Sequence, residues 1–171
     1  MNEALAQSVV DSPVGPLTVI ASDTGIRAVL WPDDQPGRVR DVAATESPTA
    51  AQRDILDAAH AQIGEYFAGV RQHFDIPLDP VGTEFQCAAW SALRQIPYGE
   101  TVSYGEQAER MGDKNKARAV GAANGKNPIS IIVPCHRVVG STGSLTGFAG
   151  GVDIKRRLLD LERRVSGQTL L

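Results

Sequence analysis

The sequence contains no apolar run close to the roughly 18 residues that a membrane-spanning helix requires. Its first residues, MNEALAQSVVDSP, lack the basic and apolar regions of a signal peptide. No internal repeat or low-complexity tract is present, and hydrophobic residues make up 42% of the 171 positions, which is enough to bury a core. We therefore expect a cytoplasmic globular protein without a membrane partner, built as one compact unit or two small domains.

Cysteine is also scarce, which excludes a disulfide-stapled scaffold. Cys87 and Cys135 could form one bridge at most, and they lie in unlike contexts, because FQCAAW is typical of a helix and VPCHRV is not. We expect both to be reduced thiols. The two cysteines and three histidines show no paired spacing of the CxxC or HxxxH kind, so the sequence predicts no metal site.

Positive charge is scarce in the first part of the chain and abundant in the rest. Residues 1–100 hold 6 Lys and Arg against 14 Asp and Glu, a net charge of −8, whereas residues 101–171 hold 11 against 6, a net charge of +5. A basic half can bind the phosphates of DNA. Charge also segregates by chance in short segments, so this asymmetry alone leaves both interpretations open.

Short β-prone runs and one amphipathic helix are expected near the N-terminus. The runs cover residues 8–11, 16–21 and 26–31, and the turn-forming sequences SPVG and SDTG separate them. This pattern predicts an antiparallel meander. Apolar residues at helical spacing predict a helix over residues 49–68 that packs on the sheet.

A linker is expected after that helix. Residues 72–76 are compatible with one more strand, and PLDPVG at residues 77–82 contains two prolines and a glycine. The predicted fold class is α/β, of the α+β type. It has an N-terminal α/β domain over residues 1–80 and a mainly helical C-terminal domain over residues 81–171.

Capping boxes mark helix starts in the C-terminal domain. Thr83 with Gln86 opens a helix whose expected apolar face holds Phe85, Ala88, Ala89 and Leu93. The same pattern opens a short helix at Ser103. That helix stops at Gly112, and Asp113 can cap a third helix that continues to Gly125. Two short helices around a glycine turn, at about residues 103–125, form a helix-turn-helix candidate, although an ordinary helical hairpin with a solvated basic face is more common.

Residues 129–133 form an apolar, β-branched run that we expect to be buried and extended, and it leads directly to Cys135. Residues 138–151 are expected to form a loop, followed by a helix over residues 152–164 with Ile154, Leu158 and Leu161 inward. Cys87 is expected in the core.

A cysteine becomes a useful nucleophile when a base or a positive charge lies beside it, and His136 and Arg137 follow Cys135 directly. Adjacent side chains of a strand point to opposite faces, so His136 can act as the base only if the chain turns there or a water bridges the gap. Taken alone, a Cys-His dipeptide is weak evidence for catalysis, because most buried cysteines are small hydrophobes.

Three longer segments, IPYGETVSYGEQAE, ARAVGAANGKNP and IIVPCHRVVGSTGSLTGFAGG, resemble the O6-alkylguanine-DNA alkyltransferase family. The resemblance covers residues 80 to 165 strongly, and the smaller N-terminal sheet and helix are compatible with it. It implies a methylated-DNA–protein-cysteine methyltransferase that acts once, with no cofactor.

The resemblance also implies roles for single residues. Cys135 is similar to the alkyl acceptor, His136 to the base that takes the thiol proton through a water, and Glu162 to the carboxylate that orients the base. Asn127 resembles the residue that braces this network. Tyr104 resembles the phenol that hydrogen bonds to guanine N3 and stabilises charge on the leaving purine.

The implied partner is double-stranded DNA that carries an alkylated guanine, bound through its minor groove by a protein that is a monomer in solution and can cluster cooperatively on DNA. Arg118 resembles the arginine that enters the base stack when the damaged base flips out. The expected DNA-binding set is completed by Ser103, Lys114, Lys116, Ala119, Ala122 and Ala123. The expected alkylguanine pocket holds Tyr104, Val138, Val139, Ser141, Phe148, Ala149 and Gly150.

The resemblance predicts direct reversal of DNA damage: the alkyl group of O6-alkylguanine, with O4-alkylthymine as a second candidate substrate, moves irreversibly to Cys135. Two other functions stay open at this point. A helix-turn-helix regulator or lesion-recognition protein would need no transfer, and a cysteine hydrolase would turn over repeatedly. The PCHRV segment after a buried run disfavours the first, and the absence of a hydrolase signature disfavours the second.

Overall fold

A computed structural model describes residues 4–40 and 42–167. The chain divides into two compact units. The first ends at Val81 and also takes in Pro128–Ser130, and the second holds Gly82–Asn127 and the chain from Ile131 onward. A C-terminal domain over residues 81–171 would include residues 128–130, which here group with the first unit. The described helices include none that is long and apolar enough to cross a membrane.

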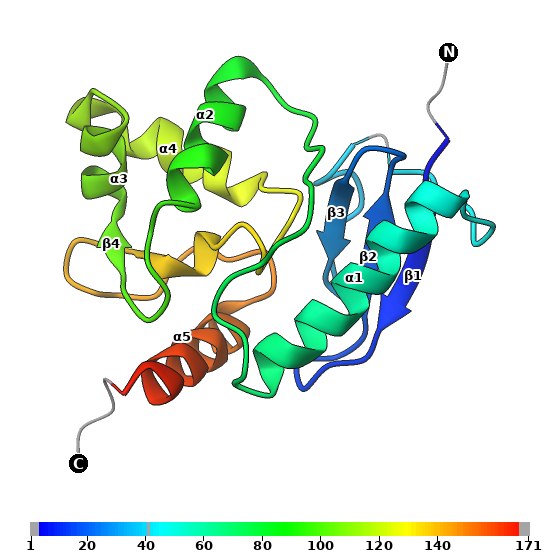
Figure 1. Ribbon diagram of the computed structural model, residues 1–171. Helices are drawn as coiled ribbons and strands as arrows, with labels where there is room; N and C mark the ends of the chain where they lie inside the picture. The colour runs from blue at the N-terminus through cyan, green and yellow to red at the C-terminus, as the bar shows by residue number, and fades with distance from the viewer. Residues whose placement is uncertain (1–3, 41, 168–171) are drawn as a thin grey trace. The chain divides into compact units, whose positions relative to one another are not determined.

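The first unit contains the expected meander and helix (Figure 1). Strands β1 (Ala6–Val10), β2 (Leu17–Ala21) and β3 (Ile26–Leu30) pair antiparallel in the order β1-β2-β3. Helix α1 (Ala50–Phe67) begins at Thr49, whose hydroxyl accepts a bond from the Gln52 amide in a capping box. Both predictions are confirmed within two residues at each end.

Both faces of the central strands are covered. Helix α1 packs against β1 and β2, as Figure 1 shows. Ile20 and Ala28, a cross-strand pair, form a cluster with Leu5, against which the partly buried Val39, Val42 and Ala44 pack. The long loop after β3 therefore serves as the second covering layer, and residues of both alternating sets can be apolar.

Short segments also shield the edges of this sheet. The Val29 amide donates to the carbonyl of Pro128 at 2.9 Å, and the Ile26 amide donates to that of Pro77 at 2.9 Å, so two separate pieces of chain lie beside β3. Thr45 pairs with the β1 edge in the same way. Paired edges do not offer free backbone groups to another chain.

The strand expected over residues 72–76 is wrong, because no strand forms there. The side chain of Gln62 in α1 bonds the backbone of Asp75 in both directions, donating at 3.1 Å and accepting at 2.8 Å. These bonds satisfy the groups that a strand partner would have used. Sheet-like pairing occurs two residues later, at Leu78.

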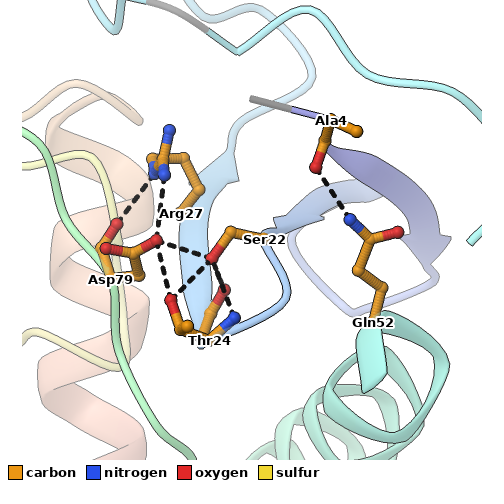
Figure 2. Close-up of polar contacts among 7 residues, drawn as sticks. Ala4, Ser22, Thr24, Arg27, Gln52 and Asp79 are labelled. Carbon is orange, nitrogen blue, oxygen red and sulfur yellow. Dashed lines mark hydrogen bonds and ion pairs between the residues drawn. The ribbon is translucent and has the colours of Figure 1, made fainter. Parts of the chain in front are cut away.

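A polar cluster fixes the end of this connection to the sheet (Figure 2). Arg27, which is buried, donates to Asp79 twice: Nε to the backbone oxygen at 2.8 Å and Nη2 to Oδ2 at 2.9 Å. The hydroxyls of Ser22 and Thr24 donate to the same Oδ2 at 2.5 and 3.1 Å. Elsewhere in the unit Gln52 donates to the carbonyl of Ala4. Burial raises the pKa of Asp79, but the hydroxyls and the Arg27 guanidinium together hold it below its ordinary value.

The second unit is mainly helical. Its elements are α2 (Glu84–Leu93), β4 (Val102–Ser103), α3 (Tyr104–Arg110), the 3-10 helix η1 (Lys114–Lys116), α4 (Ala117–Gly125), the 3-10 helix η2 (Cys135–Arg137), β5 (Val138–Val139) and α5 (Val152–Ser166).

The two capping boxes of this unit are confirmed. Thr83 caps α2 with Gln86, and Ser103 caps α3 with Glu106. Asp113 is a cap as expected, but it caps η1 by accepting from the Asn115 amide, and the predicted third helix is divided into η1 and α4. Gly112 precedes it with φ of +109°, a left-handed conformation that glycine adopts without strain.

The apolar face of α2 differs from the expected one. Ala88 is exposed, and it lines an open pocket of about 460 Å³ with Phe85, while Ala89, Trp90 and Leu93 are buried. Cys87 is only half-buried, so its assignment to the core is wrong. The reason is Trp90: its indole donates to the carbonyl of Ala123 at 2.8 Å and turns the helix face toward α4.

Buried amides join the helices of this unit. Gln107 of α3 and Asn124 of α4 exchange two side-chain bonds of 3.1 and 2.8 Å, and Gln107 also donates to the carbonyl of Ala89 in α2. A buried amide network of this kind fixes one arrangement of the helices, because any other leaves polar groups unpaired. The helix-turn-helix candidate therefore rests on a rigid support.

Residues 129–133 are buried as expected but not extended throughout. Ile131 has φ of +73°, a rare conformation for a β-branched residue, and the chain bends there. Asn127 reaches across the bend and donates to the carbonyl of Val133 at 2.9 Å. The bend directs the chain into the turn that holds Cys135.

Candidate active site and DNA-facing helix

Cys135 opens the 3-10 helix η2 and is buried. Because the chain turns here, Cys135 and His136 are not on opposite faces of a strand, and the geometric condition for a Cys-His partnership is met. Pro134, the residue before the helix, has φ of −84°, close to the range that its ring favours. A buried thiol is thus presented on a short rigid turn.

Two very short strands bring Tyr104 to this turn. Val102 and Ser103 of β4 pair in parallel with Val138 and Val139 of β5. Since Tyr104 follows β4 and Cys135 lies three residues before β5, the ladder sets the first residue of α3 beside the cysteine turn. Residues 138–139 were expected to be part of a loop, so β5 is a correction.

His136 and Glu162 form a buried pair. The ring Nε2 of His136 lies 2.6 Å from Oε2 of Glu162, and both side chains are 0% exposed. Glu162 comes from α5, so the pair joins the cysteine turn to the last helix.

A second cation completes this pair. Arg137 donates to both carboxylate oxygens of Glu162, at 2.8 and 3.1 Å, and its third nitrogen donates to the carbonyl of Ile96 at 2.8 Å. Burial raises the pKa of Glu162, but the adjacent His136 ring and the Arg137 guanidinium act against burial and hold it well below its usual range. Glu162 is therefore a carboxylate at neutral pH.

The ionised carboxylate fixes the tautomer of His136. An oxygen without a proton can only accept, so Nε2 carries the hydrogen, and in the neutral ring Nδ1 then keeps its lone pair. Nδ1 is buried and has no hydrogen-bond partner among the described residues. It is the ring nitrogen that can accept a proton.

Lys155 of α5 is a buried cation that the sequence analysis missed. Only 1% of the residue is exposed. Its Nζ donates to the carbonyl of Thr146 at 3.0 Å and lies 5.9 and 6.0 Å from the ring centres of Tyr104 and Phe148. Burial lowers the pKa of Lys155, and the charge of Cys135 acts in the opposite direction. The ammonium group therefore lies within electrostatic reach of the thiol.

Tyr104 shares the same acceptor. Its hydroxyl donates to the carbonyl of Thr146 at 3.3 Å. Burial raises the pKa of Tyr104, and Cys135 raises it further, so the phenol is a hydrogen-bond donor at neutral pH. A donor that holds one long bond can exchange it for a better acceptor.

The other expected pocket residues are dispersed over strand and loop. Val138 and Val139 are buried in the ladder, whereas Ser141 is exposed. Phe148, Ala149 and Gly150 are half-buried beside the start of α5. The structure thus joins Phe148 to the cluster of Lys155 and Tyr104.

The expected DNA-facing residues separate into two groups. Exposed positions on η1 and α4 include Lys114, Lys116, Arg118, Ala119 and Ala122. Ala123 is buried and its carbonyl accepts from Trp90, so its assignment to the DNA-facing surface is corrected. Ser103 is half-buried and occupied with capping α3.

A sequence signal for the missed Lys155 exists on α5. Lys155, Leu158, Leu159, Leu161 and Glu162 are its buried residues, while Ile154 is only half-buried. Lys155 and Glu162 are seven residues apart, which is about two helical turns, and Leu158 lies between them on the same face. A cation and an anion at apolar positions of an amphipathic helix indicate a buried polar site.

Two family descriptions cover most of the chain. Residues 5–80 match "6-O-methylguanine DNA methyltransferase, ribonuclease-like domain", and residues 84–164 match "6-O-methylguanine DNA methyltransferase, DNA binding domain". A methylated-DNA–protein-cysteine methyltransferase from Mycolicibacterium paratuberculosis is 51% identical over 164 residues, which is 94% of each chain. The protein therefore belongs to the 6-O-methylguanine DNA methyltransferase family.

Solved structures agree with this assignment. The Mycobacterium tuberculosis O6-methylguanine methyltransferase has a TM-score of 0.81 and 44% identity, with 94% of this chain and 93% of that chain covered. The M. tuberculosis OGT in complex with DNA has a TM-score of 0.82 and 45% identity, with 92% of each chain covered. The mixed α/β fold is thus confirmed, and DNA is the partner of the family's second domain.

Proposed function

We propose that this protein repairs DNA by moving the methyl group of O6-methylguanine to its own Cys135. Direct reversal by methyl transfer to a cysteine is the activity of its family. The observation that carries the choice of Cys135 is the buried pair of His136 and Glu162 beside it, in which the imidazole Nδ1 is left to accept a proton. Cys87, in contrast, is half-buried, and its thiol donates to the carbonyl of Gly82.

The proposed reaction has one covalent step. The proton of the Cys135 thiol passes to Nδ1 of His136 through a water, while Glu162 holds the other side of the ring. The sulfur forms a bond to the methyl carbon as the bond between that carbon and O6 breaks. The electron pair of the broken bond stays with the purine, which takes up a proton and becomes guanine.

Tyr104 and Asn127 have supporting roles in this proposal. Tyr104 gives up its long bond to Thr146 and donates to guanine N3, where it stabilises negative charge on the leaving purine. Asn127 holds the bend before the cysteine turn through its bond to Val133. Both roles place fixed polar groups around the reacting atoms.

DNA approaches the exposed side of η1 and α4 in this proposal. Lys114 and Lys116 contact phosphates, and Arg118 fills the base stack after the damaged base has turned out of the helix. Small exposed residues such as Ala119 and Ala122 allow close approach to the minor groove. A monomer acting on double-stranded DNA in the cytoplasm, with O4-alkylthymine as a second substrate, remains a prediction.

The protein should be consumed by its own reaction. Transfer leaves a thioether, which has no second sulfur for an exchanging thiol to attack, so thiols cannot restore Cys135. One molecule therefore removes one methyl group.

The test mixes the protein with an equal amount of a duplex that carries one O6-methylguanine and measures the protein mass. We expect one added methyl group in the wild type and in Cys87→Ser, and none in Cys135→Ser. DNA binding without any mass change would favour a lesion-recognition protein, and several turnovers per molecule would favour a hydrolase. A methyl group that still appears in Cys135→Ser would rule out Cys135 as the acceptor.

A further inference from the structure

Arg137 is bound to Glu162 in a fixed geometry. Its Nε lies 2.8 Å from Oε1 and its Nη2 lies 3.1 Å from Oε2, so the planar guanidinium faces the planar carboxylate. The remaining nitrogen is held by the carbonyl of Ile96, and the Tyr98 ring lies 5.5 Å from the guanidinium carbon. This arginine cannot turn away without breaking three bonds.

The charge of Glu162 requires a cation nearby. An isolated buried carboxylate is very unfavourable, and one positive charge is enough to balance it. Two candidates touch it: Arg137, which is always charged, and His136, which is charged only after it takes a proton. Because Arg137 already supplies the charge, a protonated His136 would leave an excess positive charge in the interior.

We infer that Arg137 keeps His136 in its neutral, proton-accepting form by balancing the charge of Glu162. Arg137 is thus a positioning residue that acts through Glu162 and His136 and does not touch the substrate. The inference rests on the proposed function, since it concerns the base of that reaction.

Other charged and titratable groups around His136 come from four parts of the unit. Cys135 precedes His136 in η2, and Glu162 of α5 bonds to it. Cys135 interacts electrostatically with Lys155 of α5 and Tyr104 of α3, and Glu162 interacts with Tyr98 in the turn after α2. Burial raises the pKa of Tyr98, with a further increase from Glu162, so its phenol is uncharged at neutral pH. Lys155 is engaged with Thr146. Arg137 remains the permanent cation that bonds directly to Glu162.

The first test measures the single-turnover rate of methyl transfer from pH 5.5 to 9.5 in wild type, Arg137→Gln and Arg137→Lys. In Arg137→Gln, His136 is the group still bonded to Glu162 that can become a cation, so the acid side of the profile should move to higher pH by at least about one unit. The rate near pH 7 should then fall about tenfold or more and recover in alkali. Arg137→Lys keeps the positive charge, so the midpoint on the acid side of its pH–rate profile should be the same as in the wild type.

A purely structural role for Arg137 would lower the rate by the same factor at every pH, and that result would overturn the inference. Scaling each rate to the amount of protein that becomes methylated removes the contribution of unfolded molecules.

The second test needs no variant and no methyl transfer. The ¹⁵N shifts of the His136 imidazole in the native protein report its protonation state at pH 7. A neutral ring with hydrogen on Nε2 is expected, and a doubly protonated ring would overturn the inference. This result stands even if the protein proves unable to transfer a methyl group, so failure of the proposed function and failure of this inference can be told apart.

Discussion

Among the described residues, each unit contains one buried arginine that is bound to a carboxylate. Arg27 and Asp79 form this pair in the first unit, where the side chains are 5% and 29% exposed. Arg137 and Glu162 form it in the second, where they are 8% and 0% exposed. Both carboxylates have a lowered pKa, and both pairs join segments far apart in the sequence.

The remaining partners of the two carboxylates differ. Asp79 accepts from the hydroxyls of Ser22 and Thr24, which do not change charge near neutral pH. Glu162 accepts from His136, whose imidazole is the proposed proton acceptor of the reaction. The same ion pair therefore serves as a fixed attachment in one unit and as the support of a proton acceptor in the other.

The largest expected effect comes from removing the charge of the fully buried carboxylate. Glu162→Gln leaves Arg137 unpaired in the interior, and we expect the free energy of unfolding to fall by about 3–5 kcal/mol. Methyl transfer should also become much slower, because the amide of glutamine can donate to Nε2 as well as accept from it and no longer fixes the tautomer of His136. Urea unfolding and single-turnover kinetics measure the two effects.

Asp160→Asn is the matched control, because Asp160 lies on the same helix in an exposed, 4.0 Å contact with Arg163. It should change stability by roughly 0.5 kcal/mol or less. Equal losses in both variants would mean that burial does not distinguish the two carboxylates.

A smaller effect is expected in the first unit. Asp79→Asn keeps the shape of the side chain but weakens its bonds to Arg27, and we expect a loss of about 1–3 kcal/mol. The rate of transfer per folded molecule should not change, since nothing near Asp79 titrates or reacts. Asp75→Asn, at an exposed position nearby, serves as the control. A slower reaction in Asp79→Asn, but not in Asp75→Asn, would contradict the claim that only the Arg137–Glu162 pair supports the reaction.

The sequence predicted some parts of both units well. The capping boxes at Thr83 and Ser103 were found because they depend on residues three positions apart. The meander was also predicted from local sequence, because turn-forming residues and short β-prone runs alternate there. The expected strand over residues 72–76 was wrong because Gln62, more than ten residues earlier, takes its backbone bonds.

The candidate site was predicted through resemblance more than through pattern. His136 was recognisable beside Cys135, but Glu162 lies 26 residues away, and no periodicity joins them. Strands β4 and β5 are two residues long, too short to show an alternation, although they bring Tyr104 to the cysteine. Arg137 was noted only as a positive neighbour, because its bonds to Glu162 exist only in the folded chain.

Acid should reduce the difference in stability between the wild type and Glu162→Gln. Its pKa lies below the ordinary value of 4.5 in the folded protein, so its contribution to stability is fully present above about pH 4.5 and is lost as the pH falls toward the lowered value. The difference between wild type and Glu162→Gln should therefore be constant from pH 7 to 5. Below that range it should shrink by up to about 1.4 kcal/mol per pH unit.

Urea unfolding at a series of pH values tests this expectation. The stability difference between the wild type and Asp79→Asn should also shrink in acid, but at a lower pH, because the ordinary pKa of Asp79 is 3.8. A difference that grows in acid would contradict the assignment of Glu162 as a carboxylate.

The smallest change in stability is expected for Lys155, a buried cation whose ammonium group bonds to the backbone carbonyl of Thr146. Methionine has a similar length and no charge, so Lys155→Met should alter the free energy of unfolding at pH 7 by about 1 kcal/mol or less, in either direction. Because burial lowers the pKa of Lys155, the unfolded chain binds more protons between that lowered value and 10.5, and wild-type stability should rise with pH in this range. The variant should lack this rise.

Lys155→Met should also transfer methyl groups more slowly, since the thiolate of Cys135 loses a nearby positive charge. Arg156→Met, at an exposed position of α5, is the control: it should keep both the rise of stability with pH and the wild-type rate. An unchanged rate in Lys155→Met would leave Arg137 as the one buried cation of this unit that affects the reaction.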